Sequence, residues 1–118
     1  MSTRDQDISR IVQAVADALR TDLVSAGELR HIIDRSWPSS APGEDVIRVV
    51  LEAVLSHGIE VGDATRSGEG YVKFTAWRGD SVTRSERALH QTRACAERDR
   101  GWAYWLCLRH NLDEYEPG

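Results

Sequence analysis

The sequence predicts an α+β domain with three N-terminal helices and a small antiparallel sheet, formed by a two-strand hairpin plus a C-terminal strand with one more helix before it. Three stretches ahead of residue 59 carry apolar residues at helical spacing. Residues 71–77 alternate in polarity, and residues 102–108 form an apolar run rich in aromatics, both typical of strands. The 118 residues suit a single domain, with residues 1–5 and 112–118 expected to be frayed.

The first two helices are predicted from apolar side chains that recur three and four positions apart. The first is expected to last to about Arg20, with its apolar face made by Ile8, Ile11, Val12, Val15 and Leu19. The second begins at a capping box, in which the Ser25 and Glu28 side chains each bind a free backbone amide. Pro38 ends this helix, whose apolar positions are Leu29, Ile32, Ile33 and Trp37.

The third helix, residues 44–58, is predicted to be the buried centre of the domain. Its wide apolar face, which suggests neighbours on more than one side, consists of Val46, Ile47, Val49, Val50, Leu51, Ala53 and Val54. Gly58 can adopt the left-handed conformation that ends a helix. A short strand, residues 59–62, is expected to follow directly.

The remaining elements are a hairpin, a fourth helix and a last strand. Residues 63–70 are polar and lack a period, so they are expected to be the hairpin loop before strand 71–77, whose two faces both carry aromatics. Thr83 and Glu86 fit a second capping box for a helix through about residue 99, with an inward face of Leu89, Thr92, Cys95 and Ala96 and an outward face of Arg84, Arg87 and Arg98. The strand at 102–108 most simply pairs with strand 71–77.

Composition and charge restrict the function classes. The formal net charge is -4, and a single Lys among many Ala, Arg, Asp and Val residues is typical of high-GC bacterial genomes. With no apolar N-terminal run, no membrane span and two cysteines, we expect a soluble cytoplasmic protein. Residues 25–64 are acidic, with seven acids against three Arg, whereas residues 65–110 carry nine Arg or Lys against five acids.

The order helix, helix, helix, hairpin resembles that of a winged-helix module. In such modules the third helix reads the major groove of DNA and the hairpin contacts phosphates, so both should be basic. Here the third helix carries three acids and one arginine, which disfavours a nucleic-acid partner. A winged-helix transcriptional regulator that uses Arg66, Lys73 and Arg78 is the alternative to a protein-binding function.

No sequence pattern points to catalysis, a cofactor or a metal. A zinc site built from His90, Cys95, Cys107 and His110 is disfavoured by spacing, because His90 and Cys95 fall on different sides of a helix. Cys107 as a nucleophile would need a nearby base and an oxyanion site, and no local pattern provides them. A Cys95–Cys107 disulfide is geometrically possible but unexpected in the cytoplasm. We therefore expect a protein that is not an enzyme.

Protein binding is the function class that the residues favour. Aromatics gather in the C-terminal half, and Tyr71, Trp77 and one of Tyr104 or Trp105 are expected to be partly exposed. Acids of the middle segment would steer a basic partner, either another protein or a second copy. The expected partner-binding residues are Glu44, Asp45, Glu52, Glu60, Tyr71, Trp77 and Trp105.

Residues 46–108 also resemble small uncharacterised bacterial proteins, some of them similar to immunity proteins of polymorphic toxin systems. The resemblance lies in the run Val54 to Asp63, in Gly70-Tyr71-Val72 with Trp77, in the helix from Ser81 and in Trp105-Leu106. These motifs are structural and include no catalytic residue. The resemblance implies a compact acidic inhibitor or adaptor that masks another protein.

Overall fold

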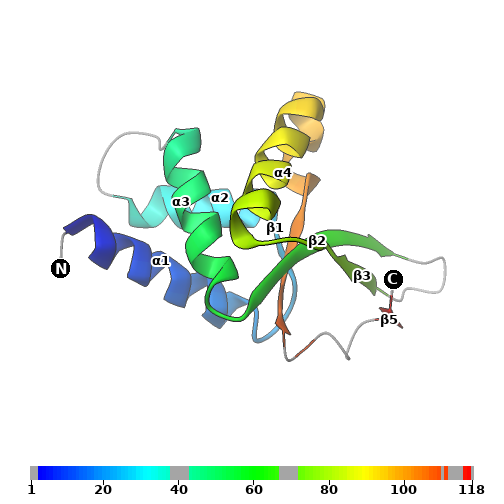
Figure 1. Cartoon of the computed structure of the whole chain (residues 1–118), viewed down its shortest axis with the longest axis horizontal. Helices are drawn as coiled ribbons and strands as arrows, with labels where there is room; N and C mark the ends of the chain where they lie inside the picture. Colours follow the sequence, from blue (N-terminus) through cyan, green and yellow to red (C-terminus); the bar gives the residue numbers. More distant parts are fainter. Residues whose placement is uncertain (1–2, 38–42, 67–71, 110, 112–115, 118) are drawn as a thin grey trace.

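The computed structural model describes residues 3–37, 43–66, 72–109, 111 and 116–117, and it confirms the α+β class (Figure 1). The helices are α1 (Thr3–Ala18), α2 (Ala26–Ser36), α3 (Glu44–Leu55), α4 (Ser81–Ala94) and the 3-10 helix η1 (Glu97–Trp102). The strands are β1 (Val24–Ser25), β2 (Ile59–Arg66), β3 (Val72–Ala76), β4 (Trp105–Leu108) and β5 (Glu116–Pro117). α1 thus begins before Ile8, and residues 1–2, 112–115 and 118 of the segments expected to be frayed lie outside the described residues.

The sheet has the strand order β1-β4-β2-β3-β5, with every pairing antiparallel except β3 with β5. The predicted pairing of the last strand with residues 71–77 is wrong, because β4 lies between β1 and β2. β3 and β4 lie along opposite edges of β2, which continues into the expected loop as far as Arg66. Its first half pairs with β4 and its second half pairs with β3, and Gly62 pairs with both strands. The β2–β3 hairpin reaches away from the helices (Figure 1).

Each face of the sheet contributes to a separate hydrophobic cluster. Leu106 joins the main core under the helices, whereas Cys107, the next residue, points to the opposite face because side chains alternate along a strand. The second cluster consists of Leu23, Phe74 and Cys107, with Ala64, Ala76 and Trp105 packed against it. In the main core, Val50 and Leu51 are fully buried and α3 packs against both α1 and α4, which confirms the predicted central helix.

The local signals at two helix ends are confirmed. The Glu28 backbone amide donates to Ser25 Oγ at 3.1 Å, and the Ser25 amide donates to Glu28 Oε1 at 3.5 Å, which completes the capping box of α2. Gly58 has φ +78°, so it adopts the left-handed conformation expected after α3. β2 begins at the next residue.

The start of α4 differs from the prediction. Asp80, rather than Thr83, is the N-cap, and its Oδ1 accepts a hydrogen bond from the Thr83 amide at 2.7 Å. Gly79, with φ +117°, makes the turn that places this cap ahead of the expected one. The helix also ends earlier, so Cys95 is the half-buried C-cap and Ala96 is exposed. The buried face consists of Ser85, Ala88 and Leu89.

The Asp80 cap should make stability depend on pH. Hydrogen bonds from the Thr83 backbone and side chain lower the pKa of Asp80 below its usual 3.8. A carboxylate with a lowered folded-state pKa stabilises the fold above the unfolded pKa, and this contribution is lost as pH falls through the folded pKa. Asp80→Asn keeps a capping side chain without the charge. The stability difference between the unmodified protein and Asp80→Asn, measured by urea unfolding, should therefore shrink on acidification below about pH 4; a constant difference would contradict this assignment.

Candidate functional site

A cavity of about 320 Å³ lies between α2, α3, α4 and η1. Its apolar wall is formed by Leu29, Ile33, Ile47 and Leu89. Its polar and charged lining comprises Arg30, Glu44, Thr92, Arg93, Arg100 and Tyr104. Four elements, of which α2, α3 and α4 are well separated in the sequence, therefore converge on one partly apolar, partly charged hollow.

One end of the cavity is closed by the packing of η1 against α2. A Cβ atom on Gly27 would lie 3.2 Å from the Cα of Gly101, so the two backbones are in direct contact there. The Ala26 amide donates to the Tyr104 carbonyl at 3.0 Å, and Gln91 Nε2 donates to the Ala103 carbonyl at 3.0 Å. These bonds hold the segment after η1 against both α2 and α4.

The charges of the cavity lining are predominantly positive. Arg93 Nε lies 3.3 Å from Glu44 Oε1, an ion pair that joins α4 to α3, and Arg30 Nε lies 3.3 Å from Oδ1 of Asp34 on the same helix. Arg100 is different, because its guanidinium forms no ion pair or hydrogen bond with any residue that the structure describes. Three arginines against one glutamate make the lining attractive to anions.

Tyr104 adds a largely buried aromatic side chain with a hydroxyl group to the lining. The residue is 3% exposed, and its side chain makes no hydrogen bond within the described part of the chain. Desolvation raises the pKa of Tyr104 well above its ordinary value, outweighing the opposing effect of the Arg30 charge. The phenol therefore stays protonated at neutral pH and keeps its proton available for donation.

Trp102, the last residue of η1, is 64% exposed and directly follows two residues of the cavity lining. Among the described residues, the large hydrophobic side chains with comparable exposure are Trp102 and Val82. Trp102 was not among the predicted binding residues, and the apolar run 102–108 was predicted to be a strand throughout. The strand begins only at Trp105. The charged run that precedes Gly101 was the available signal that this segment lies at the surface.

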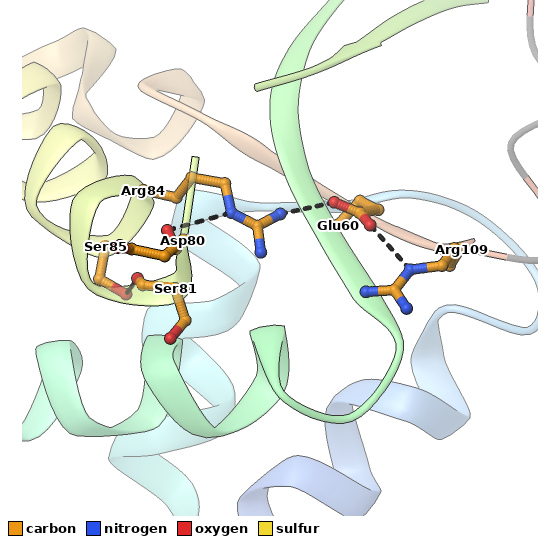
Figure 2. A network of polar contacts seen from close by, with 6 residues as sticks. All are labelled: Glu60, Asp80, Ser81, Arg84, Ser85 and Arg109. Atoms are coloured by element: carbon orange, nitrogen blue, oxygen red, sulfur yellow. Dashed lines mark hydrogen bonds and ion pairs between the residues drawn. The ribbon is translucent and has the colours of Figure 1, made fainter. Parts of the chain in front are cut away.

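Glu60 lies at the centre of a polar network on β2 (Figure 2). Its carboxylate accepts a hydrogen bond from Arg84 Nη1 at 2.6 Å and another from Arg109 Nε at 2.8 Å. Arg84 Nε also donates to the Asp80 carbonyl at 3.3 Å. The Glu60 and Arg84 side chains are only 14% and 11% exposed. Two expectations are thus corrected, since Arg84 does not face outward and Glu60 is engaged inside the protein.

Removing the Glu60 charge should destabilise the fold. Glu60→Gln leaves two guanidiniums without their carboxylate, one of them largely buried, and should lower the free energy of unfolding by about 1–3 kcal/mol. Urea unfolding measures the difference. Glu86→Gln is the matched control, because Glu86 is exposed and forms no ion pair within the described residues. If both variants unfold alike, the network contributes nothing to stability.

The aromatic residues predicted to bind a partner do not form one surface. Trp77 is 5% exposed, contrary to expectation; its Nε1 donates to Asp63 Oδ2 at 3.0 Å, and the Arg87 guanidinium lies 4.1 Å from its ring centroid. Its position at the end of β3 turns it into the main core. Trp105 is half-buried in the second cluster. Tyr71 lies outside the described residues.

The three acidic residues of α3 also lie in different surroundings. Glu44 borders the cavity and pairs with Arg93, Asp45 is exposed, and Glu52 is half-buried. Of the predicted site residues, only Glu44 lines the cavity. The arginines of the lining, Arg30, Arg93 and Arg100, were not among the residues predicted to bind a partner.

The surroundings of α3 bear on the winged-helix alternative. α3 packs against α1 on one side and α4 on another, so little of it is available to enter a DNA groove. Arg48, the one basic residue of this helix, has a buried Nε without a hydrogen-bond partner among the described residues. Insertion of β4 between β1 and β2 adds a strand to the sheet beside the hairpin. Lys73 and Arg78 are exposed.

Comparison of the chain with protein-family models, with curated proteins and with solved structures yields no match.

None of the described helices is long and apolar enough to cross a membrane. Cys95 packs against the main core and Cys107 belongs to the second cluster, so the two sulfurs belong to different parts of the interior. Within the described residues, no three His, Cys, Asp or Glu side chains gather as a metal site would require.

Proposed function

We propose that the chain is a non-enzymatic protein-binding module, an inhibitor or adaptor that acts by covering part of another protein. The observation that carries this proposal is the 64% exposure of Trp102 beside an arginine-lined cavity. Tryptophan and arginine are the residue types most enriched among the side chains that dominate binding energy at protein interfaces. Covering a tryptophan with a partner contributes the most binding free energy where the fold leaves its side chain exposed to water.

The charge around Trp102 indicates the chemistry of the partner. Arg93 and Arg100 belong to the same side of the molecule as the end of η1, since both line the adjoining cavity. Glu44 and Glu60, from which we expected a basic partner, are each paired with arginine within the chain. The proposed partner is therefore acidic at the contact, and it packs an apolar surface against Trp102.

A winged-helix regulator is the weaker proposal. Its third helix would have to leave the contacts with α1 and α4, or read DNA with a face whose exposed charges are Glu44 and Asp45. Acidic side chains are repelled by phosphates. The similarity to immunity proteins agrees with the protein-binding proposal in function class, and the proposal does not rest on it.

The test is capture of the partner from cells of the source organism, followed by reconstitution of the complex from purified components. Trp102→Ala should weaken the dissociation constant by about thirtyfold or more, the effect of losing an interface hot spot. Val82→Ala is the control, because Val82 is 50% exposed and lies on α4, away from the cavity lining. A reconstituted complex that is indifferent to Trp102→Ala would overturn the proposal.

Two further measurements separate the alternatives. Sedimentation velocity would reveal a dimer, and a dimer that Trp102→Ala dissociates would identify the partner as a second copy. Retention on duplex DNA at low salt, with an affinity that falls steeply as salt rises, would favour the regulator instead.

A further inference from the structure

The cavity between α2, α3, α4 and η1 has the size and lining of a small-molecule site. Its volume of about 320 Å³ is that of a small ligand pocket, which typically spans about 300–1,000 Å³. The side chains of Leu29, Ile33, Ile47 and Leu89 provide a continuous aliphatic wall. Such a wall favours an apolar group over the water that would otherwise occupy the space.

Some polar groups of the lining already have a hydrogen-bond or ion-pair partner within the described residues, and others do not. Thr92 Oγ1 donates to the Ala88 carbonyl at 2.8 Å, and Arg30 and Arg93 are paired with carboxylates of the chain. The Arg100 guanidinium and the Tyr104 hydroxyl have no partner within the described residues. Tyr104 is 3% exposed and lines the cavity, so its hydroxyl can donate to a group that is bound there.

The Arg100 guanidinium and the Tyr104 hydroxyl are both hydrogen-bond donors, so both favour an acceptor such as a carboxylate. A guanidinium presents forked N–H donors that match the two oxygens of a carboxylate, and a protonated phenol adds a further donor. No unpaired acceptor of comparable strength lines the cavity, because the Glu44 carboxylate is held by Arg93. The complement of this lining is an anion attached to an apolar body.

We infer that this cavity binds a small organic monocarboxylate with an apolar body, with the carboxylate on Arg100 and Tyr104 and the apolar body against the aliphatic wall. A polypeptide segment is too large for the enclosed volume. The inference shares Arg100 with the proposed protein contact, whereas Trp102 lies outside the lining, so the Trp102→Ala test of that contact leaves the cavity itself unchanged.

Titration with phenylacetate and naphthylacetate, followed by isothermal calorimetry and by backbone amide NMR shifts, tests the inference. At least one acid should bind saturably at one site, with the largest shifts at residues around the cavity. The uncharged amide analogue of that acid should bind at least about tenfold more weakly, because it lacks the carboxylate. Acetate should also bind at least about tenfold more weakly, because it lacks the ring. Equal binding of acid and amide, shifts elsewhere, or no binding of either acid at millimolar concentration would overturn the inference.

Variants test the residues assigned to the carboxylate. Arg100→Gln should weaken binding by about tenfold, the effect of losing a charge-assisted hydrogen bond. Arg98→Gln is the matched control, since Arg98 is 89% exposed and pairs with Asp99 outside the lining. Tyr104→Phe should also weaken binding, because it removes the hydroxyl donor. Circular dichroism verifies that this variant folds. Binding that is unchanged by Arg100→Gln, or equally weakened by Arg98→Gln, would contradict the assignment of the carboxylate.

Discussion

Replacing Gly62 with alanine should lower the free energy of unfolding by about 3 kcal/mol or more, the upper range for overpacking a filled site. A Cβ atom at this position would lie 2.0 Å from the Thr75 carbonyl oxygen and 2.9 Å from the Ala76 Cα. Both contacts are with backbone, so no side-chain rotation relieves them. Gly62 also pairs with β3 and β4 at once, at the point where β2 changes partners. Any shift that makes room for the methyl group therefore disturbs three strands.

Urea unfolding followed by circular dichroism measures this effect. Gly43→Ala is the matched control, because a Cβ on Gly43 meets no atom within 4 Å. Gly43 is the N-cap of α3, so a change of less than about 1 kcal/mol is expected from the weaker capping by alanine. Similar stabilities for the two variants would mean that β2 and β3 do not approach as closely as described.

Replacing Leu51 with alanine should destabilise the protein by about 2–5 kcal/mol, the range for truncating a fully buried leucine. Leu51 is 0% exposed in the middle of α3, and the helix is held between α1 and α4. Neighbours on both sides restrict collapse into the space that the side chain vacates. The cost therefore includes a residual cavity as well as the lost burial.

Thermal and urea unfolding of Leu51→Ala should be compared with those of Val49→Ala. Val49 lies on the same helix but is half-buried, so its truncation removes less apolar contact. Alanine also has the higher helix propensity, which offsets part of the loss. If Leu51→Ala were as mild as Val49→Ala, α3 would not be an interior helix, and the packing argument against DNA binding would fail with it.

The features that could be predicted from the sequence are those decided by neighbouring residues. The Ser25 capping box, the left-handed Gly58 and the apolar face of α3 each depend on a few adjacent positions, and each is confirmed. The start of α4 was predicted wrongly although it is also local. Asp80 and Thr83 are both capping residues, and the turn at Gly79 favours the first of them.

Features that depend on distant residues could not be predicted in this way. Alternation along 71–77 separates the two faces correctly, but it does not tell which face meets the helices, so the burial of Trp77 was missed. β4 pairs with β1 and β2, and no local pattern in residues 105–108 identifies these distant partners. Glu60 and Arg109 are 49 positions apart. No spacing rule groups Arg30, Arg93 and Arg100, so the cavity appears only when the helices are assembled.

The position of β4 has a consequence for biosynthesis. In a nascent chain, the segments of β1, β2 and β3 leave the ribosome before residues 105–108 do. These last residues form β4, which lies between β1 and β2 in the folded sheet. Until then Val24 and Val61 lack the neighbour that covers them, and unpaired strand edges of this kind promote aggregation. The ribosome must therefore release residues 105–108 before the sheet can close, so the central pairings of the sheet form after all the helices that cover it have been synthesised.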